Sequence, residues 1–182
     1  MKKTKKVAGL KDVTEVTDPW RNWGFLIGWE EKLKSLLCSK KVLFVGVGST
    51  IRGDDGVGVF LAGLLKPYFP VFIAGERPEN LLSRELRGVE TVIFLDACSF
   101  GGKTGDIKLL KTEETENRFL YSHRVPLHLI ASLLEGTEVY ILGIEPCELM
   151  PGAGLSQRVK KSAYLVRDFI KSHCERQKGE SS

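Results

Sequence analysis

The sequence lacks the features that mark secreted, membrane-spanning and zinc-binding proteins. Its cysteines, Cys38, Cys98, Cys147 and Cys174, are widely spaced and form no C-x-x-C pair, so neither a zinc knuckle nor a dithiol redox motif is predicted. No uncharged apolar run approaches the roughly 20 residues that cross a bilayer. Acidic residues interrupt the N-terminal stretch where a signal peptide would need a continuous apolar segment. We therefore expect a cytoplasmic protein with reduced thiols and no membrane contact.

The chain also carries little net charge for its length. Of its 182 residues, 27 are lysine or arginine and 23 are aspartate or glutamate, which gives a net charge of +4. The basic excess is concentrated in the first eleven residues, MKKTKKVAGLK, and no basic stripe interleaved with aromatic residues follows. This pattern predicts a solvated arm and no nucleic-acid partner. The length of 182 residues predicts a single core, and we expect a monomer.

Hydrophobic periodicity divides the chain into four parts. We predict a flexible basic arm at 1–22, an accessory amphipathic helix at 23–40, the main domain at 41–174 and a disordered tail at 175–182.

In the main domain, short apolar runs alternate with helical stretches. Strands are predicted at 42–47, 71–74, 92–95, 107–110 and 139–143, and helices at 57–65, 81–86, 127–134 and 155–170. Continuously apolar strands are typical of parallel sheets that are buried on both faces. The fold class is therefore α/β: a three-layer αβα sandwich whose largely parallel twisted sheet has about five strands and one antiparallel edge, for which 107–110 is the candidate.

A glycine-rich loop with two adjacent carboxylates follows the first predicted strand. Residues 46–58, GVGSTIRGDDGVG, lack the third glycine of a dinucleotide fingerprint and the Gly-Lys-Ser/Thr of a P-loop. Two carboxylates repel a polyphosphate and suit a cation, because the positive end of the next helix keeps them ionised. Either Asp54 or Asp55 could simply cap that helix. A cap needs only one carboxylate, so the other is a candidate site residue.

Two more candidates are predicted at the same edge of the sheet. Asp96 directly follows the predicted strand 92–95, and His123 precedes a helix whose start is marked by Pro126. Together with Asp55 they could form an open site for a divalent transition metal such as nickel or zinc. The two carboxylates alone could act as an acid/base pair. His128 lies five residues beyond His123, off its helical face, and is not expected to be a ligand.

Six segments occur in an order that resembles the [NiFe]-hydrogenase maturation endopeptidases, especially the branch acting on formate-hydrogenlyase-type hydrogenases. The resemblance covers nearly all of residues 41–172. It rests on residues 46–58, Pro78-Glu79-Asn80, Leu95-Asp96-Ala97, Gly105-Asp106-Ile107, Ser122-His123-Arg124-Val125-Pro126-Leu127 and Leu142-Gly143-Ile144-Glu145-Pro146.

The resemblance implies an endopeptidase that removes the C-terminal extension of a hydrogenase large-subunit precursor after nickel insertion. It implies that Asp55, Asp96 and His123 contact the metal and are the catalytic residues. The metal would be nickel carried by the precursor or another divalent transition metal at the same site. Three mechanisms stay open: recognition of the precursor's nickel, polarisation of a water by a metal, and a proton shared between Asp55 and Asp96.

The same loops are expected to bind the substrate. The predicted substrate-binding residues are Gly48, Gly53, Asp54 and Glu145. For Glu145, an ordinary loop acid is the alternative. The chain departs from the family at Ser49, where asparagine is usual, and ahead of Gly75, where an acid is usual and Ile73 and Ala74 stand.

Two other functions stay open from the sequence. A non-enzymatic nickel-binding maturation chaperone would bind metal and leave the precursor uncut. A peptidyl or aminoacyl hydrolase of similar topology, acting on an RNA-linked substrate, would need a basic groove, and the carboxylates of the loop argue against one.

Overall fold

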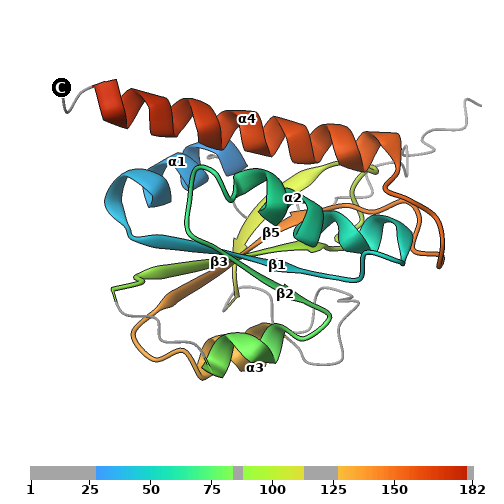
Figure 1. Cartoon of the computed structure of the whole chain (residues 1–182), viewed down its shortest axis with the longest axis horizontal. Coiled ribbons are helices and arrows are strands. Elements are labelled where there is room, and N and C mark those ends of the chain that lie inside the picture. Colours follow the sequence, from blue (N-terminus) through green and yellow to red (C-terminus); the bar gives the residue numbers. More distant parts are fainter. Residues whose placement is uncertain (1–27, 84–87, 113–126, 180–182) are drawn as a thin grey trace, which may run out of the picture.

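The structure, a computed structural model, describes residues 28–83, 88–112 and 127–179, in which a five-stranded sheet lies between two layers of helices (Figure 1). The strands are β1 (Val42–Val47), β2 (Val71–Gly75), β3 (Thr91–Ala97), β4 (Ile107–Lys111) and β5 (Glu138–Ile144). The α-helices are α1 (Trp29–Ser39), α2 (Val57–Leu65), α3 (Leu127–Ser132) and α4 (Gln157–Gly179), and two short 3-10 helices are η1 (Gly53–Gly56) and η2 (Pro78–Ser83).

The sheet has the order β2-β1-β3-β5-β4. β1 pairs in parallel with β2 and β3, β3 pairs in parallel with β5, and β4 runs antiparallel to β5 at the edge. This confirms the predicted fold class and the antiparallel edge. From β1 the chain goes to β2 on one side and then crosses to β3 on the other, so the strand order reverses between β1 and β3. Open α/β sheets bind ligands at the carboxyl ends of the strands at such a point.

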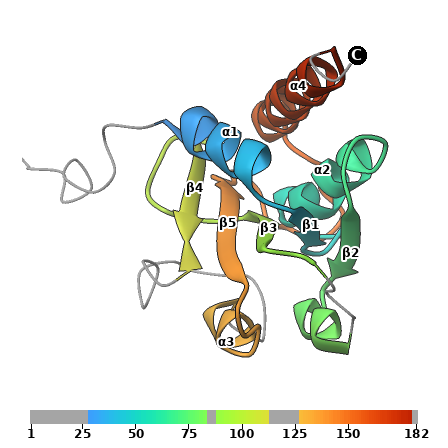
Figure 2. The same ribbon diagram turned by 90° about the vertical axis from the view of Figure 1, so that its left-hand side faces the viewer.

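Separate apolar cores cover the two faces of the sheet. α1, α2 and α4 pack with Phe44 and Leu95 on one face, while α3 and η2 pack with Val47 and Phe94 on the other (Figure 2). Because successive side chains of a strand point to opposite faces, Asp96 belongs to the same face as Phe94.

The accessory helix belongs to this core. α1 begins at Trp29 and buries Leu33, Leu36 and Leu37 with the residues of α2 and α4, while residues 23–27 of the predicted helix lie outside the described residues. The Trp29 ring packs edge-on against Phe169 of α4, with the centroids 5.3 Å apart. Apolar contact with α4 thus fixes the position of α1 on this face of the sheet.

Other predicted boundaries shift in ways that local structure explains. Of the helix predicted at 81–86, residues 81–83 belong to η2, which starts at Pro78, where the missing N–H of proline costs nothing, and residues 84–86 lie outside the described residues. α3 ends at Ser132, before the predicted residue 134. α4 continues to Gly179, so the disordered tail predicted from residue 175 is wrong for residues 175–179. β3 extends past residue 95, because its pairing with β5 continues through Ala97.

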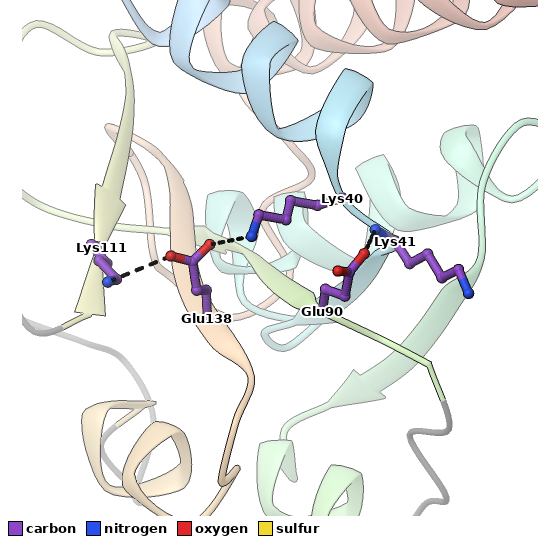
Figure 3. Close-up of polar contacts among 5 residues, drawn as sticks. All are labelled: Lys40, Lys41, Glu90, Lys111 and Glu138. Atoms are coloured by element: carbon purple, nitrogen blue, oxygen red, sulfur yellow. Dashed lines mark hydrogen bonds and ion pairs between the residues drawn. The ribbon is translucent and has the colours of Figure 1, made fainter.

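Charged contacts within the chain hold the amino-terminal edge of the sheet (Figure 3). The carboxylate of Glu138 lies 3.9 Å from the ammonium of Lys40 and 3.8 Å from that of Lys111, and Glu90 accepts a hydrogen bond of 2.9 Å from the backbone N–H of Lys41. Such exposed pairs each contribute about 0–1 kcal/mol. Among the helices that the structure describes, none has the length and apolarity to cross a membrane.

Candidate active site

Asp55 lies at the carboxyl end of β1, and only one of its two carboxylate oxygens accepts a hydrogen bond from a described residue. Its side chain is only 2% exposed. The backbone N–H of Ser49 donates a hydrogen bond of 2.9 Å to Oδ2. No residue in the described ranges donates one to Oδ1, which is also buried. Buried carboxylate oxygens normally have a partner, so this atom is placed to contact a group from elsewhere.

A glycine places Asp55 at this point. Gly58, in the first turn of α2, lies so close to the strand tips that an added Cβ would be 1.9 Å from the carbonyl oxygen of Leu95 and 2.4 Å from that of Val47. α2 can therefore start directly on the ends of β1 and β3, with Asp55 in the preceding turn. Gly58 therefore permits the close approach of the helix start to the strand ends.

Asp96 reaches the same edge from the neighbouring strand. It is the penultimate residue of β3 rather than the residue after it, lies opposite Gly143 of β5, and is 1% exposed. η1, which carries Asp55, contacts β3. The structure thus brings the two carboxylates to the ends of adjacent strands. Their catalytic role stays a prediction.

His123, the third predicted ligand, lies outside the described residues. Within residues 28–83, 88–112 and 127–179, no three histidine, cysteine or acidic side chains form a group that could hold a metal ion. The predicted metal contact therefore depends on His123 joining Asp55 and Asp96.

Asp54 is not a helix cap, which corrects the sequence interpretation. α2 has Gly56 at its N-cap and no side-chain cap. The fully buried Asp54 carboxylate instead accepts three backbone hydrogen bonds, from Cys147 (2.9 Å) and Glu148 (3.0 Å) to Oδ2 and from Ser156 (2.6 Å) to Oδ1. It fastens the loop 147–156 to η1, which gives it a structural role; its predicted contact with a substrate stays a prediction.

The two glycines predicted to bind substrate both have positive φ, +114° for Gly48 and +56° for Gly53. A Cβ on Gly48 would lie 1.8 Å from the carbonyl oxygen of Asp55, and one on Gly53 would lie 2.4 Å from that of Glu148. These glycines let the loops that surround the carboxylates pack closely. Contact with a substrate stays a prediction for both.

Glu145 has its carboxylate engaged within the chain. It is 6% exposed and accepts hydrogen bonds from the hydroxyl of Ser99 (2.8 Å) and from the N–H groups of Phe100 (2.8 Å) and Gly102 (3.0 Å). These bonds hold the turn that follows β3. They favour the alternative interpretation of Glu145 as a loop acid over a residue of the substrate groove.

Cys98 lies between Asp96 and Glu145 but is not suited to nucleophilic catalysis. Its Sγ is 3.8 Å from Oδ2 of Asp96. Burial raises the pKa of the Cys98 thiol well above its usual value, and the charge of Asp96, the hydrogen bond to it and the charge of Glu145 raise that pKa further. The thiolate is the reactive form, so a thiol kept neutral by its surroundings is inert.

Sequence reasoning missed Glu76. This residue directly follows β2, and its Oε1 accepts a hydrogen bond from the hydroxyl of Ser49. The rule that found Asp55 and Asp96, an acid where a parallel strand ends, would also have found Glu76. The family pattern predicts an acid ahead of Gly75, whereas in this chain an acid directly follows that glycine.

Known proteins match both the sequence and the fold. Residues 63–172 match the family model described as hydrogenase maturation protease. The hydrogenase 3 maturation protease of Escherichia coli K12 is 36% identical over 109 residues, which cover 55% of this chain and 69% of that protein. The crystal structure of the [NiFe] hydrogenase maturation protease HycI from Thermococcus kodakarensis has a TM-score of 0.67 at 27% identity and covers 77% of this chain and 99% of that one. The solution structure of the Escherichia coli endopeptidase HycI has a TM-score of 0.63 at 27% identity, with 70% and 87% covered.

Proposed function

The chain belongs to the hydrogenase maturation protease family, and we propose that it removes the C-terminal extension from the precursor of a [NiFe]-hydrogenase large subunit after nickel has been inserted. The observation that carries this proposal is the pair of buried carboxylates, Asp55 and Asp96, at the point where the strand order reverses. Membership of a protease family argues against the chaperone and against the RNA-linked hydrolase.

We propose that Asp55, Asp96 and His123 contact the nickel that the precursor carries. The unequal hydrogen bonding of Asp55 supports this role, because Ser49 fixes Oδ2 and no described residue donates to Oδ1. Burying a carboxylate oxygen without a partner is unfavourable, and a bound cation removes that penalty. The precursor would then bind productively only when its metal is in place.

Two other catalytic types remain as alternatives: a metal held by the enzyme itself, and a proton shared between the two carboxylates. A resident metal site is usually supported by further hydrogen-bonded acids around its ligands. Of the nearby acids, Asp54 and Glu145 direct their carboxylates to the amides of two loops, and Glu76 accepts from the hydroxyl of Ser49. This commitment favours recognition of nickel carried by the substrate.

The test is cleavage of precursor prepared with and without nickel, followed on a gel and by mass measurement of the released tail. The wild-type enzyme is expected to cut only nickel-loaded precursor, and to do so even after the enzyme has been dialysed against a chelator. The variants Asp55→Asn, Asp96→Asn and His123→Ala are expected to lose cleavage. Equal cutting of nickel-free precursor would overturn the metal recognition. Loss of activity after dialysis, with recovery when a metal is added back, would indicate a resident metal.

A further inference from the structure

A third carboxylate reaches the proposed site from β2. Ser49 connects it to Asp55, because the serine hydroxyl donates to Oε1 of Glu76 while the serine N–H donates to Oδ2 of Asp55 at 2.9 Å. The backbone N–H of Gly48 also donates to the carbonyl oxygen of Gly75 at 2.9 Å, which fixes the ends of β1 and β2 to each other. A single residue therefore separates the carboxylate of Glu76 from that of Asp55.

Glu76 differs from the other acids near the site because the described residues use little of its capacity to accept hydrogen bonds. Asp54 and Glu145 are buried and accept three hydrogen bonds each. Glu76 is exposed and accepts one, from a serine that is 3% exposed and so is itself held in place. Among the described residues, no lysine or arginine forms an ion pair with Glu76. Within the described part of the chain, Glu76 is thus an anchored carboxylate beside Asp55 that pairs with no lysine or arginine.

We propose that Glu76 is a specificity-determining residue that binds a lysine or arginine side chain of the precursor next to the scissile bond. The proposal rests on the proposed function: Ser49 bridges Asp55 and Glu76, so a peptide bound with its scissile bond at Asp55 and Asp96 would have a neighbouring side chain within reach of Glu76. A carboxylate selects a cation by charge, and a guanidinium can pair with both of its oxygens. The contact lies at the surface, so salt is expected to weaken it.

The experiment measures kcat/KM for nickel-loaded precursor and for precursor variants in which each lysine or arginine within four residues of the mapped cut is changed to glutamine. Glu76→Gln is expected to lower kcat/KM on the native precursor about fivefold, mainly through KM, which corresponds to one exposed ion pair. On the precursor that lacks the responsible cation, the same substitution is expected to change nothing. Glu76→Lys should cut a precursor with glutamate at that position better than it cuts the native one.

Two more variants act as controls. Ser49→Ala removes the hydroxyl that anchors Glu76 but keeps the backbone N–H that holds Asp55, so a smaller loss in the same direction is expected. Glu135→Gln neutralises an exposed acid that precedes β5 at the opposite edge and should leave kcat/KM unchanged.

The two proposals fail in different ways. If the wild type does not cut loaded precursor, the proposed function is wrong. If the wild type cuts and Glu76→Gln is equally active, or loses the same factor on every precursor variant, only the role of Glu76 is overturned. The absence of any lysine or arginine within four residues of the cut would overturn it as well.

Discussion

Asp54→Asn is expected to destabilise the protein although it changes only one oxygen into an amide nitrogen. Both oxygens of the Asp54 carboxylate accept hydrogen bonds, and all three donors are backbone N–H groups, of Cys147, Glu148 and Ser156. A backbone N–H cannot become an acceptor. Whichever way the asparagine is turned, its NH₂ group therefore faces at least one of these backbone N–H groups. The less costly orientation gives up the bond from Ser156 and keeps the other two.

The loss follows from these three bonds. Leaving one buried N–H without an acceptor costs about 1–3 kcal/mol. The other two bonds change from a charged to a neutral acceptor, and charge-assisted bonds are about twice as strong as neutral ones. Together these effects predict a loss of about 3 kcal/mol, or about 6–12 °C in Tm for a chain of this size.

Glu145→Gln is the matched control, because it makes the same chemical change in a carboxylate that also accepts three hydrogen bonds. Here one of the donors is the hydroxyl of Ser99, which can turn and accept from the new NH₂ group. The glutamine oxygen can keep the bonds from Phe100 and Gly102, which both go to Oε2. Thermal melts should therefore show a loss of about 1 kcal/mol, from weaker bonds alone. Equal shifts in Tm for the two variants would refute this account of Asp54.

Gly58→Ala is expected to lower the unfolding free energy by about 3 kcal/mol, because its methyl group would meet the carbonyl oxygen of Leu95 at 1.9 Å. Gly63→Ala, on the same helix with open space around it, should raise that free energy by about 0.5–1 kcal/mol. Urea unfolding of both variants measures the two opposite changes. Cys98 should resist iodoacetamide at pH 8 while the exposed Cys147 reacts, and equal labelling by peptide mass would contradict a buried neutral thiol. Folding raises the pKa of Cys98, so its contribution to the unfolding free energy is complete below about pH 8.5 and is lost as the pH rises towards the folded-state pKa. In urea melts, Cys98→Ala should therefore show a smaller fall of the unfolding free energy with rising pH.

Much of the fold follows from the sequence because the pattern and the packing agree. The helix 57–65 has the predicted bounds, and the antiparallel edge lies where residues 107–110 indicate. The disagreements occur where contacts across the chain decide. β3 continues through Asp96 because β5 pairs with it there, which the apolar pattern of one strand cannot reveal.

At the site, position along a strand is readable from sequence but hydrogen-bond partners are not. The placement of Asp55 and Asp96 follows from where two parallel strands end. The partners of Asp54 come from residues more than 90 positions away, between Cys147 and Ser156, and no local pattern records them. A short-range interpretation therefore allows a helix cap at Asp54 or Asp55 and does not reveal that Asp54 holds a loop.

The adjacent carboxylates of η1 should therefore separate stability from activity. In Asp55→Asn the amide oxygen can keep the hydrogen bond from Ser49, while the NH₂ group replaces an oxygen that has no donor among the described residues. The substitution removes a buried negative charge that has one oxygen without a hydrogen-bond partner among the described residues, which is an unfavourable arrangement. We therefore expect a Tm equal to or above that of the wild type. The negative charge that holds a divalent cation is lost as well, so cleavage of nickel-loaded precursor should disappear. If, below its melting temperature, Asp54→Asn is inactive while Asp55→Asn still cuts, the loop has been interpreted one residue out of register, and the proposed metal contact of Asp55 is wrong.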